Sequence, residues 1–330
     1  MNNNKLLEVK NLRTYFLLDE GTVKAVDGIS FEINKGKTLG IIGESGCGKS
    51  VTALSIMRLT GPKSKIVEGE IIYYPEDKDK PIDIAKLDPL GPEMRSIRGK
   101  EISMIFQEPR ASFSPVHTIG EQIIEAIQLH QKLDKKRARE AAIEMLRVVG
   151  IPRPELRIDE YPHQLSGGLC QRAMIAMALS CKPQLLIADE PTTNLDVTIQ
   201  AQILELLKQL QELFGMAVIM ITHNLGVIAE TAEDVIVMYL GKIVESAKVD
   251  ELFENPLHPY TRALMESIPH IGPKRRRLKA IKGIVPDPYN LPNGCTFHPR
   301  CEYVMPECKE NLPELKEVKP GHKVSCFLYK

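Results

Sequence analysis

The sequence has no tryptophan and few other aromatic residues, with nine Tyr and eight Phe in a chain of 330 residues. It also lacks a net charge, because 43 Lys and Arg residues balance 43 Asp and Glu residues. Proteins that bind nucleic acid usually carry a clear excess of positive charge. We therefore expect no nucleic-acid partner.

Long hydrophobic runs are missing as well. The longest, such as residues 235–240, are far shorter than the roughly 20 residues that a membrane-spanning helix needs. No apolar stretch of signal-peptide length follows residues 1–5. With 43% hydrophobic and 26% charged residues, the composition is that of a soluble globular protein. We expect a cytoplasmic protein that does not itself cross a membrane.

Closely spaced cysteine pairs are also absent. Cys47, Cys170 and Cys181 are scattered, whereas four cysteines fall in the last part of the chain: Cys295, Cys301, Cys308 and Cys326. In a reducing compartment such a group more often binds a metal or acts in redox chemistry than forms disulfides. Structural zinc sites usually begin with a Cys-x-x-Cys pair, which weakens zinc without excluding it. Four cysteine ligands suit a [4Fe–4S] cluster.

A glycine-rich stretch is the strongest motif that is present. Residues 43–50 fit the pattern Gly, four residues, Gly-Lys-Ser/Thr, between an apolar run and a helix-compatible run. The glycines let phosphate oxygens approach backbone N–H groups, and the next helix presents its positive end to the same anion. A chance match in a glycine-rich turn is the alternative. The expected phosphate-binding residues are Gly43, Glu44, Ser45, Gly46, Cys47, Gly48, Lys49, Ser50 and Val51.

Two residues of this motif and one aromatic residue outside it have predicted roles within a nucleotide site. Lys49 would reach the β- and γ-phosphates, and the Ser50 hydroxyl would bind Mg²⁺. One of the scarce aromatic rings, Tyr15 or Phe16, could stack on an adenine ring. The alternative for both rings is a place in the core or in a turn.

Polar residues follow further short apolar runs that we interpret as buried strands: Gln107, the pair Asp189 and Glu190, and His223. Ligands of nucleotide-binding folds bind at the carboxyl ends of strands. Asp189 is predicted to hold Mg²⁺, and Glu190 to polarise the water that attacks the γ-phosphate. Gln107 is predicted to reach Mg²⁺ or that water, and His223 the γ-phosphate. The alternatives are a strand cap, an ordinary strand-to-loop transition and a structural histidine.

A second glycine motif, Ser166-Gly167-Gly168, precedes a helix that is predicted to run to about Leu179. Ser166 can cap that helix, and the two glycines would expose its first N–H groups to an anion. Alone, the motif would be a plain capped helix start. Its position shortly before Asp189 favours a second phosphate contact.

The remaining patterns give the layout of the fold. Short β-branched runs from about residue 6 to 74 predict a partly antiparallel β-region, and residues 75–100 look like a surface loop. Residues 119–150 show helical spacing. Beyond about residue 270 the sequence becomes proline-rich. We interpret its basic run, residues 274–277, as a solvated linker, with lipid headgroup contact as the alternative.

In this order the motifs resemble the ATP-binding cassette (ABC) ATPases over residues of about 5–255. The nearer resemblance, to the ATPases of dipeptide and oligopeptide importers, comes from residues 191–193, 196–202, 258–264 and 286–301. It implies an α/β P-loop NTPase cassette at 1–257, with a RecA-like core, an antiparallel β-subdomain and a helical subdomain at about 110–180. It also implies a small cysteine-rich C-terminal domain at 258–330.

The resemblance also implies partners. Two ATPase subunits would pair head to tail, so that Ser166, Gly167 and Gly168 contact the γ-phosphate of ATP held by the other subunit. Residues 107–115 would receive a coupling helix from one of two transmembrane permease subunits, and an extracytoplasmic solute-binding protein would act indirectly. The chain would then be peripheral, on the cytoplasmic face of the cell membrane. The resemblance favours Phe16 over Tyr15 as the adenine platform and a [4Fe–4S] cluster over zinc.

The implied activity is ATP hydrolysis that powers the import of di- and oligopeptides. Nickel or an oligosaccharide remains an alternative solute, because the ATPase does not touch the solute. A non-transport cassette ATPase is the other alternative, although no coiled-coil insertion or second cassette is visible. Leu169, Cys170 and Asn194 depart from the residues usual in this family. None removes a group that hydrolysis needs, so we expect activity with altered interface contacts.

Overall fold

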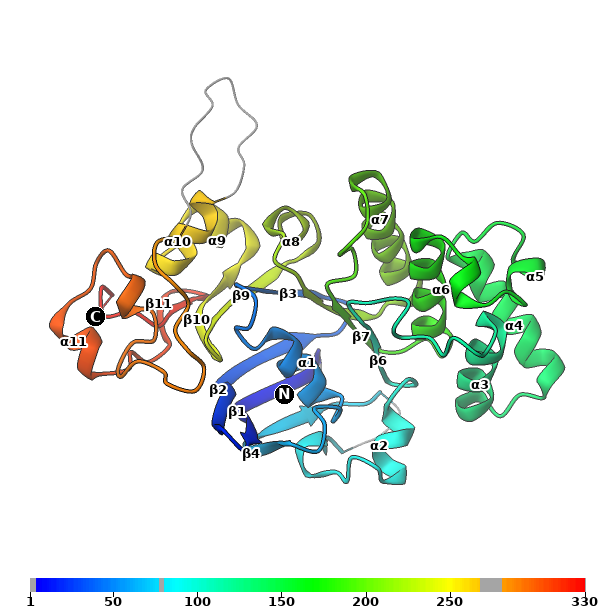
Figure 1. Ribbon diagram of the computed structural model, residues 1–330, viewed down its shortest axis with the longest axis horizontal. Helices are drawn as coiled ribbons and strands as arrows, with labels where there is room; N and C mark the ends of the chain where they lie inside the picture. The colour runs from blue at the N-terminus through cyan, green and yellow to red at the C-terminus, as the bar shows by residue number, and fades with distance from the viewer. Residues whose placement is uncertain (1–3, 77–79, 268–280, 330) are drawn as a thin grey trace, which may run out of the picture.

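The computed structural model describes residues 4–76, 80–267 and 281–329, and Figure 1 shows its arrangement. The basic run at 274–277 lies outside the described residues. Two sheets and a group of helices make up the fold. The helices are α1 (Lys49–Ile56), α2 (Pro92–Ile97), α3 (Ile119–Gln131), α4 (Lys135–Val148), α5 (Pro154–Arg157), α6 (Gly167–Leu179), α7 (Val197–Phe214), α8 (Leu225–Thr231), α9 (Val249–Glu254), α10 (Pro259–Glu266) and α11 (Pro306–Glu310).

An eight-stranded sheet forms the centre of the molecule, with the order β11-β12-β10-β9-β3-β8-β7-β6. Strands β9, β3, β8, β7 and β6 pair in parallel, and β3, β6, β7 and β8 are buried along their whole length. Continuous apolar runs suit strands that are covered on both faces. The strands are β3 (Thr38–Ile42), β6 (Ile102–Ile105), β7 (Leu185–Asp189), β8 (Ala217–Ile221), β9 (Asp234–Tyr239), β10 (Lys242–Lys248), β11 (Lys316–Lys319) and β12 (His322–Val324).

Alternate residues of the parallel strands enter two different hydrophobic cores, because successive side chains of a strand point to opposite faces. On β7, Leu185 and Ile187 belong to the core shared with α1 and the second sheet. Leu186 and Ala188 belong to the core shared with α3, α4, α6 and α7. The central sheet is therefore the common wall of both cores.

The second sheet is antiparallel and has the order β2-β1-β4-β5. Its strands are β1 (Lys5–Leu18), β2 (Gly21–Asn34), β4 (Ser64–Tyr73) and β5 (Ile82–Asp83). This confirms the predicted antiparallel β-region that leads into the central strand β3. The surface loop predicted at 75–100 is wrong in part, because it contains β5, α2 and the 3-10 helix η1 (Ile84–Lys86), and Met94 and Ile97 are buried there.

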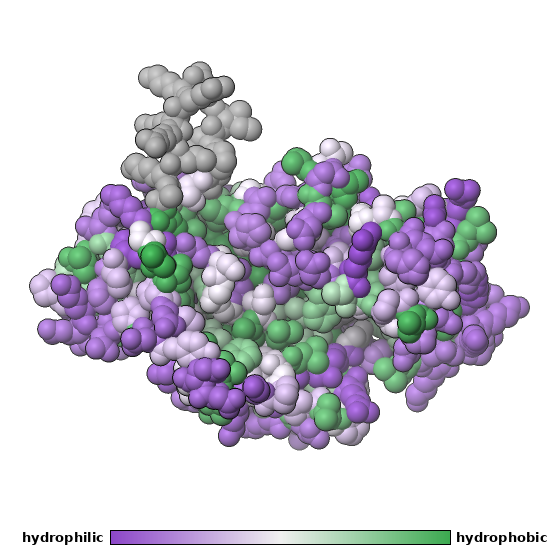
Figure 2. Space-filling view, viewed as in Figure 1, coloured by the Kyte–Doolittle hydropathy of each residue, from purple (hydrophilic) through white to green (hydrophobic). Residues whose placement is uncertain are grey.

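The helices α3, α4 and α6 form a separate lobe at one end of the molecule (Figure 1). Thr118 and Glu121 form a capping box at the start of α3, and Asp134 caps α4, so local sequence sets where both helices begin. The lobe is hydrophilic over α4, whereas hydrophobic residues gather in the middle of the face shown in Figure 2. No helix among the described residues is long and apolar enough to cross a membrane.

The expectation of a separate C-terminal domain is not supported. Strand β12 pairs with β10 and β11 pairs with β12, so the C-terminal region extends the central sheet. Its Phe297 is 2% exposed and lies in the same core as Tyr239, with the two ring centroids 5.2 Å apart. A region with little apolar surface of its own gains burial by joining an existing core.

A buried carboxylate fixes this junction. Glu245 of β10 is fully buried and accepts hydrogen bonds from the backbone N–H groups of Leu257 and His258, at 2.7 and 2.9 Å. Its Oε1 also lies 2.7 Å from Nε2 of His322 on β12. One side chain therefore joins the central sheet, the segment before α10 and the last strand.

Candidate nucleotide site

The phosphate loop, residues 43–50, runs from the end of β3 into α1, as predicted. Gly48 has a φ of 102°, and a Cβ there would lie 2.2 Å from the carbonyl oxygen of Ala25. Gly43 has a φ of 151°, and a Cβ there would lie 2.3 Å from the carbonyl oxygen of Met238. Only glycine fits these positions, because both the backbone conformation and the space exclude a side chain.

Lys49 is held inside the loop. Its side-chain Nζ donates to the carbonyl oxygens of Gly43 and Glu44, at 2.8 and 3.0 Å, and the residue is 6% exposed. Ser45 and Gly46 are exposed at the rim. The backbone of the loop therefore fixes the position of its own ammonium group.

The other predicted residues lie along the same edge of the central sheet. Neighbouring strands end at the same level, because Ile105 pairs with Ala188, and Ile221 pairs with both Asp189 and Ile41. Parallel strands present their carboxyl ends together. Gln107, Asp189, Glu190 and His223 are thereby brought next to the phosphate loop.

Glu190 is the centre of a hydrogen-bonded group. The Oε1 atom lies 3.0 Å from Nδ1 of His223, while Oε2 accepts from Thr193 Oγ1 at 2.7 Å and from Gln107 Nε2 at 3.3 Å. Burial raises the pKa of Glu190, but the hydrogen bonds from Thr193 and His223 outweigh it, and the pKa is lowered. The hydrogen bonds thus favour the ionised form of the carboxylate.

Thr193 was missed as a site residue by the sequence analysis. It lies in the 191–193 run that supports the family resemblance, three residues after Glu190. The only local indication in the sequence was the hydroxyl of Thr193, three residues after the Glu190 carboxylate. Nothing local showed that the loop folds the hydroxyl back onto it.

Asp189 lies deeper than its neighbour. It is 5% exposed, and its Oδ1 is buried with no hydrogen-bond partner in the described part of the chain. Burial raises the pKa of Asp189, whereas a hydrogen bond with the Ser50 side chain opposes the rise. A buried, unpartnered carboxylate oxygen beside a hydroxyl is a donor set that suits Mg²⁺, which prefers oxygen ligands.

The Ser-Gly-Gly motif lies elsewhere. Ser166 caps α6, accepting from the backbone N–H of Leu169 at 3.4 Å, and Ser166 and Gly167 are exposed. In Figure 1, α6 lies in the helical lobe, apart from α1 and the phosphate loop. A single chain therefore does not bring the Ser-Gly-Gly motif and the phosphate loop together.

The three departures from family usage have different surroundings. Cys170 is fully buried in the core, so its side chain faces inward rather than toward a partner, and Leu169 is partly buried against the same core. Asn194 Nδ2 donates to Glu108 Oε1 at 3.1 Å. This hydrogen bond joins the loop after β7 to the loop after β6.

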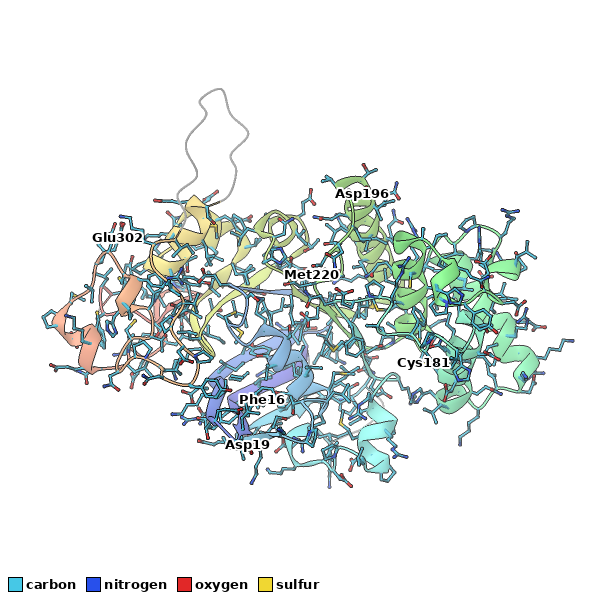
Figure 3. The ribbon with its side chains drawn as sticks, in the orientation of Figure 1. Phe16, Asp19, Cys181, Asp196, Met220 and Glu302 are labelled. Atoms are coloured by element: carbon cyan, nitrogen blue, oxygen red, sulfur yellow. The ribbon has the colours of Figure 1, made fainter. Side chains whose placement is uncertain are left out.

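The two candidate adenine rings differ in their contacts. The Tyr15 hydroxyl donates to Asp27 at 2.7 Å, and the Lys24 ammonium lies 5.9 Å from its ring centroid. Phe16 is half-buried and lies opposite Val23 on β2, and Figure 3 labels it on this sheet. Tyr15 is thus held by polar partners, whereas no polar partner holds Phe16 among the described residues. Its role stays a prediction.

The four C-terminal cysteines all line one small cavity together with His258. All seven cysteines of the chain are free thiols. The described residues nonetheless contain no group of three or more Cys, His, Asp or Glu side chains placed to hold a metal ion. The predicted [4Fe–4S] cluster and the zinc alternative are therefore not supported as a formed site.

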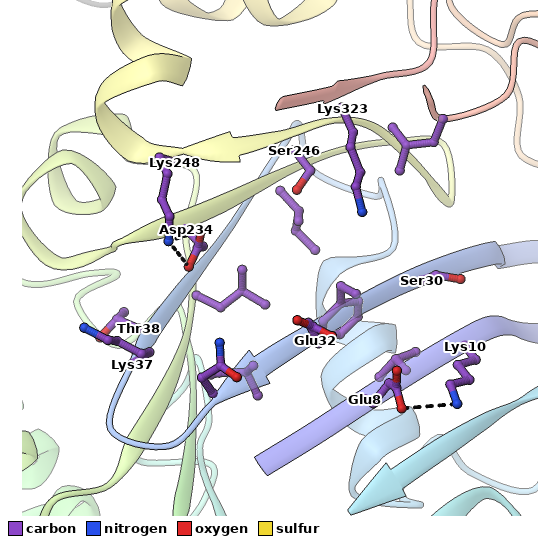
Figure 4. Close-up of a pocket in the computed structure, with 17 residues that line it drawn as sticks. Glu8, Lys10, Ser30, Glu32, Lys37, Thr38, Asp234, Ser246, Lys248 and Lys323 are labelled. Carbon is purple, nitrogen blue, oxygen red and sulfur yellow. Dashed lines mark hydrogen bonds and ion pairs between the residues drawn. The ribbon is translucent and has the colours of Figure 1, made fainter. Parts of the chain in front are cut away.

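A larger cavity of about 400 Å³ lies at the opposite edge of the central sheet (Figure 4). Its lining includes Thr38 and Asp234, which begin β3 and β9, and Lys323 of β12. Parallel strands place their ligand sites at the other end. This cavity is therefore separate from the phosphate loop.

Comparison with known proteins agrees with the motifs. The family described as "ABC transporter" matches residues 26–193, and the family described as "Oligopeptide/dipeptide transporter, C-terminal region" matches residues 244–308. The oligopeptide transport ATP-binding protein AppD of Bacillus subtilis (strain 168) is 53% identical over 98% of this chain and 97% of its own length. The dipeptide transport ATP-binding protein DppD of the same organism is 48% identical over 98% and 95%.

Solved structures share the fold. The ATP-binding cassette MJ0796, solved as a dimer bound to ADP and phosphate, gives a TM-score of 0.64 at 28% identity, over 74% of this chain and 98% of that one. CbiO1 of Clostridium perfringens gives 0.62 at 26% identity, over 77% and 92%. The chain has the ABC cassette fold and belongs to the ATP-binding subunits of oligopeptide and dipeptide ABC transporters, which are ATPases coupled to peptide transport.

Proposed function

We propose that this chain hydrolyses ATP at the edge of its central sheet and thereby powers the import of di- and oligopeptides. The observation that carries the proposal is the ionised Glu190, held by Thr193, His223 and Gln107 beside the phosphate loop. A carboxylate fixed in this way can orient one water molecule for attack on the terminal phosphate. The close relatives named as peptide transport proteins support the choice of solute.

Each predicted residue has a separate task in this proposal. Residues 43–51 hold the phosphates, with Lys49 on the β- and γ-phosphates. Asp189 and Ser50 hold Mg²⁺, which offsets phosphate charge when it is bound with ATP. Glu190 would orient the water, Gln107 would reach Mg²⁺ or that water, and His223 would contact the γ-phosphate. Phe16 stacks on adenine.

We further propose that two ATPase subunits pair head to tail. The exposed Ser166 and Gly167 at the start of α6 have no nucleotide to bind within their own chain, because the phosphate loop lies in another part of the molecule. A second subunit would supply that nucleotide. The dimer of MJ0796 supports such a pair. The partner is a second copy or a related ATPase subunit.

The membrane partners are also part of the proposal. The segment after β6 carries exposed apolar side chains, with Phe106 37% and Val116 73% exposed. Exposed apolar groups of this kind suit docking of a permease subunit, since they gain burial on contact. The chain would thus lie on the cytoplasmic face of the membrane, with a solute-binding protein on the other side.

The four cysteines are proposed to hold a [4Fe–4S] cluster, with zinc as the alternative. Two observations support this: all four line one cavity, and a backbone N–H two residues further on approaches the thiols of Cys295, Cys301 and Cys326. Burial raises the pKa of Cys295 to about 11, and the N–H donors favour the thiolate form that ligation needs. Anaerobic purification followed by iron and sulfide analysis tests the proposal, and stoichiometric zinc without iron would contradict it.

Uptake measurements test the proposed solute. In cells that lack this subunit, we expect labelled di- and tripeptide uptake to be lost and to return with the wild-type chain. The Lys49→Ala variant should not restore it, because the phosphate contact is missing. Loss of nickel or oligosaccharide uptake, with peptide uptake intact, would assign the chain to one of those solutes instead.

A further inference from the structure

Glu44 places a negative charge inside a loop that binds anions. It is the second residue of the phosphate loop, and its side chain is 26% exposed. An unbalanced carboxylate at this position would repel a triphosphate, since like charges a few ångströms apart cost free energy unless a counter-charge is present. The loop therefore needs a nearby cation other than Lys49, whose ammonium serves the phosphates.

Arg300 supplies that cation from a distant part of the sequence. Its Nη1 and Nη2 donate to the two carboxylate oxygens of Glu44 at 2.6 and 3.1 Å, and its side chain is only 3% exposed. Its Nε donates to the carbonyl oxygen of Lys282 at 3.1 Å. The guanidinium is thus fixed at both ends, and a two-pronged pair of this kind is more directional than a single contact.

A second contact holds the backbone of the same residue. The N–H of Glu44 donates to the hydroxyl of Tyr260 at 2.8 Å, and Tyr260 is fully buried. Its ring packs against those of Tyr239 and Phe297, with centroids 4.7 and 5.4 Å away. The guanidinium of Arg300 lies 5.9 Å from the centroids of the same Tyr239 and Phe297 rings. The C-terminal region therefore holds both the side chain and the N–H of one phosphate-loop residue.

We propose that Arg300 is a positioning residue of the nucleotide site, which pairs with Glu44 to neutralise the phosphate loop and so sets its affinity for ATP. The C-terminal region then forms part of the nucleotide site as well as an extension of the sheet. The inference rests on ATP binding at this loop, which the proposed function requires, but on no particular solute or metal.

The proposal separates affinity from turnover. Arg300 faces Glu44 and not the Glu190 group, so its loss should weaken ATP binding and raise KM while kcat stays within about twofold. In Arg300→Gln the uncompensated charge of Glu44 should weaken ATP binding roughly tenfold. The effect should grow as the salt concentration falls, because the repulsion between Glu44 and the phosphates is then screened less.

The decisive test is rescue by a second substitution. The dissociation constant of a fluorescent ATP analogue is measured for wild type, Arg300→Gln, Glu44→Gln and the double variant. Removing both charges should restore binding to within about threefold of wild type, because the repelling carboxylate is gone. Glu44→Gln alone should bind at least as tightly as wild type. Arg300→Lys, which keeps the charge, should bind more tightly than Arg300→Gln.

Arg139→Gln is the matched control. Arg139 makes an equivalent two-pronged pair with Asp159, at 2.8 and 2.7 Å, on the exposed surface of the helical lobe. Its substitution should leave ATP affinity unchanged.

Two results would overturn the inference. One is a double variant that binds as weakly as Arg300→Gln, which would mean that Arg300 only holds the C-terminal region in place. The other is an Arg300→Gln variant with wild-type affinity. If wild-type protein itself fails to bind the analogue, the proposed function falls together with the inference, so the two failures are distinguishable.

Discussion

The hydroxyl of Thr193 donates a 2.7 Å hydrogen bond to Oε2 of Glu190, the carboxylate oxygen that also accepts from Gln107. Glu190 itself has a φ of 48°, a left-handed backbone conformation that is uncommon for a residue with a side chain. Strained residues persist only where surrounding contacts fix them. The Thr193 hydroxyl is one of those contacts, and it fixes the orientation of the proposed base.

Replacing Thr193 tests this relationship. In Thr193→Val we expect kcat for ATP hydrolysis to fall about tenfold or more, since a hydrogen bond to a charged group is worth about 1.5–3 kcal/mol. Thr193→Ser keeps the hydroxyl and should retain most of the activity. Steady-state hydrolysis by the three proteins is the measurement. Retained activity in Thr193→Val together with lost activity in Thr193→Ser would show that the methyl group, not the hydroxyl, is needed.

The pH profile gives a second readout for the same group. Burial raises the pKa of Glu190, and the hydrogen bond from Thr193 is the first of the interactions that lower it below its usual range. Losing that bond should raise the pKa, so the acid limb of kcat against pH should move to higher pH in Thr193→Val. A limb that stays in place would mean that the bond does not act on the titration of Glu190.

Substitution of the proposed base should separate binding from hydrolysis. Glu190→Gln keeps the shape of the side chain and one oxygen but removes the charge that activates water. We expect hydrolysis to be nearly abolished, with ATP retained in a closed pair of subunits. Gel filtration with Mg·ATP and a turnover assay measure the two effects. Undiminished turnover would remove Glu190 from this role.

Asp189→Asn is expected to raise the stability of the nucleotide-free protein and to lower ATP turnover. The Oδ1 atom of Asp189 is buried and unpartnered in the described structure, and burial raises the pKa of the carboxyl group. Removing the charge is expected to stabilise the nucleotide-free protein, because burial disfavours the ionised form of this side chain. Turnover should fall because a proposed Mg²⁺ ligand is lost.

Thermal unfolding with and without Mg·ATP checks this prediction. Wild type should gain more stability from Mg·ATP than Asp189→Asn does, because at a given ligand concentration the stabilisation increases with the logarithm of the affinity. A variant that is less stable without nucleotide, yet gains as much from Mg·ATP, would contradict the assignment of Asp189 to the metal.

Glu245 should be among the most sensitive positions for stability. Glu245→Ala leaves two buried backbone N–H groups and the imidazole of His322 without their acceptor. Removing one partner from a buried, charged hydrogen-bonded group lowers the free energy of unfolding by about 3–5 kcal/mol. Urea unfolding and limited proteolysis of the C-terminal region measure the loss. Glu205→Ala is the control, because Glu205 is exposed on α7 and accepts a hydrogen bond from Gln209 at 2.8 Å, and it should change stability little.

The sequence alone determined the phosphate loop and the strand ends, because both depend on local chemistry. Gly43 and Gly48 occupy conformations and spaces that only glycine fits. Because no other residue can stand there, the spacing of the two glycines identifies the loop in the sequence. Asp189 and His223 follow apolar runs long enough for buried strands, and parallel strands bring their carboxyl ends together without further information.

The tertiary structure alone decided which distant residues complete the site. Arg300 donates a hydrogen bond to Glu44, which lies 256 positions earlier in the sequence. Strand β12 pairs with β10 of the central sheet and does not form part of a separate domain. No periodicity or spacing encodes such contacts, because they form only when separate elements pack on one core. Thr193 shows the same limit over three residues, since the turn that directs its hydroxyl to Glu190 depends on the neighbouring strands.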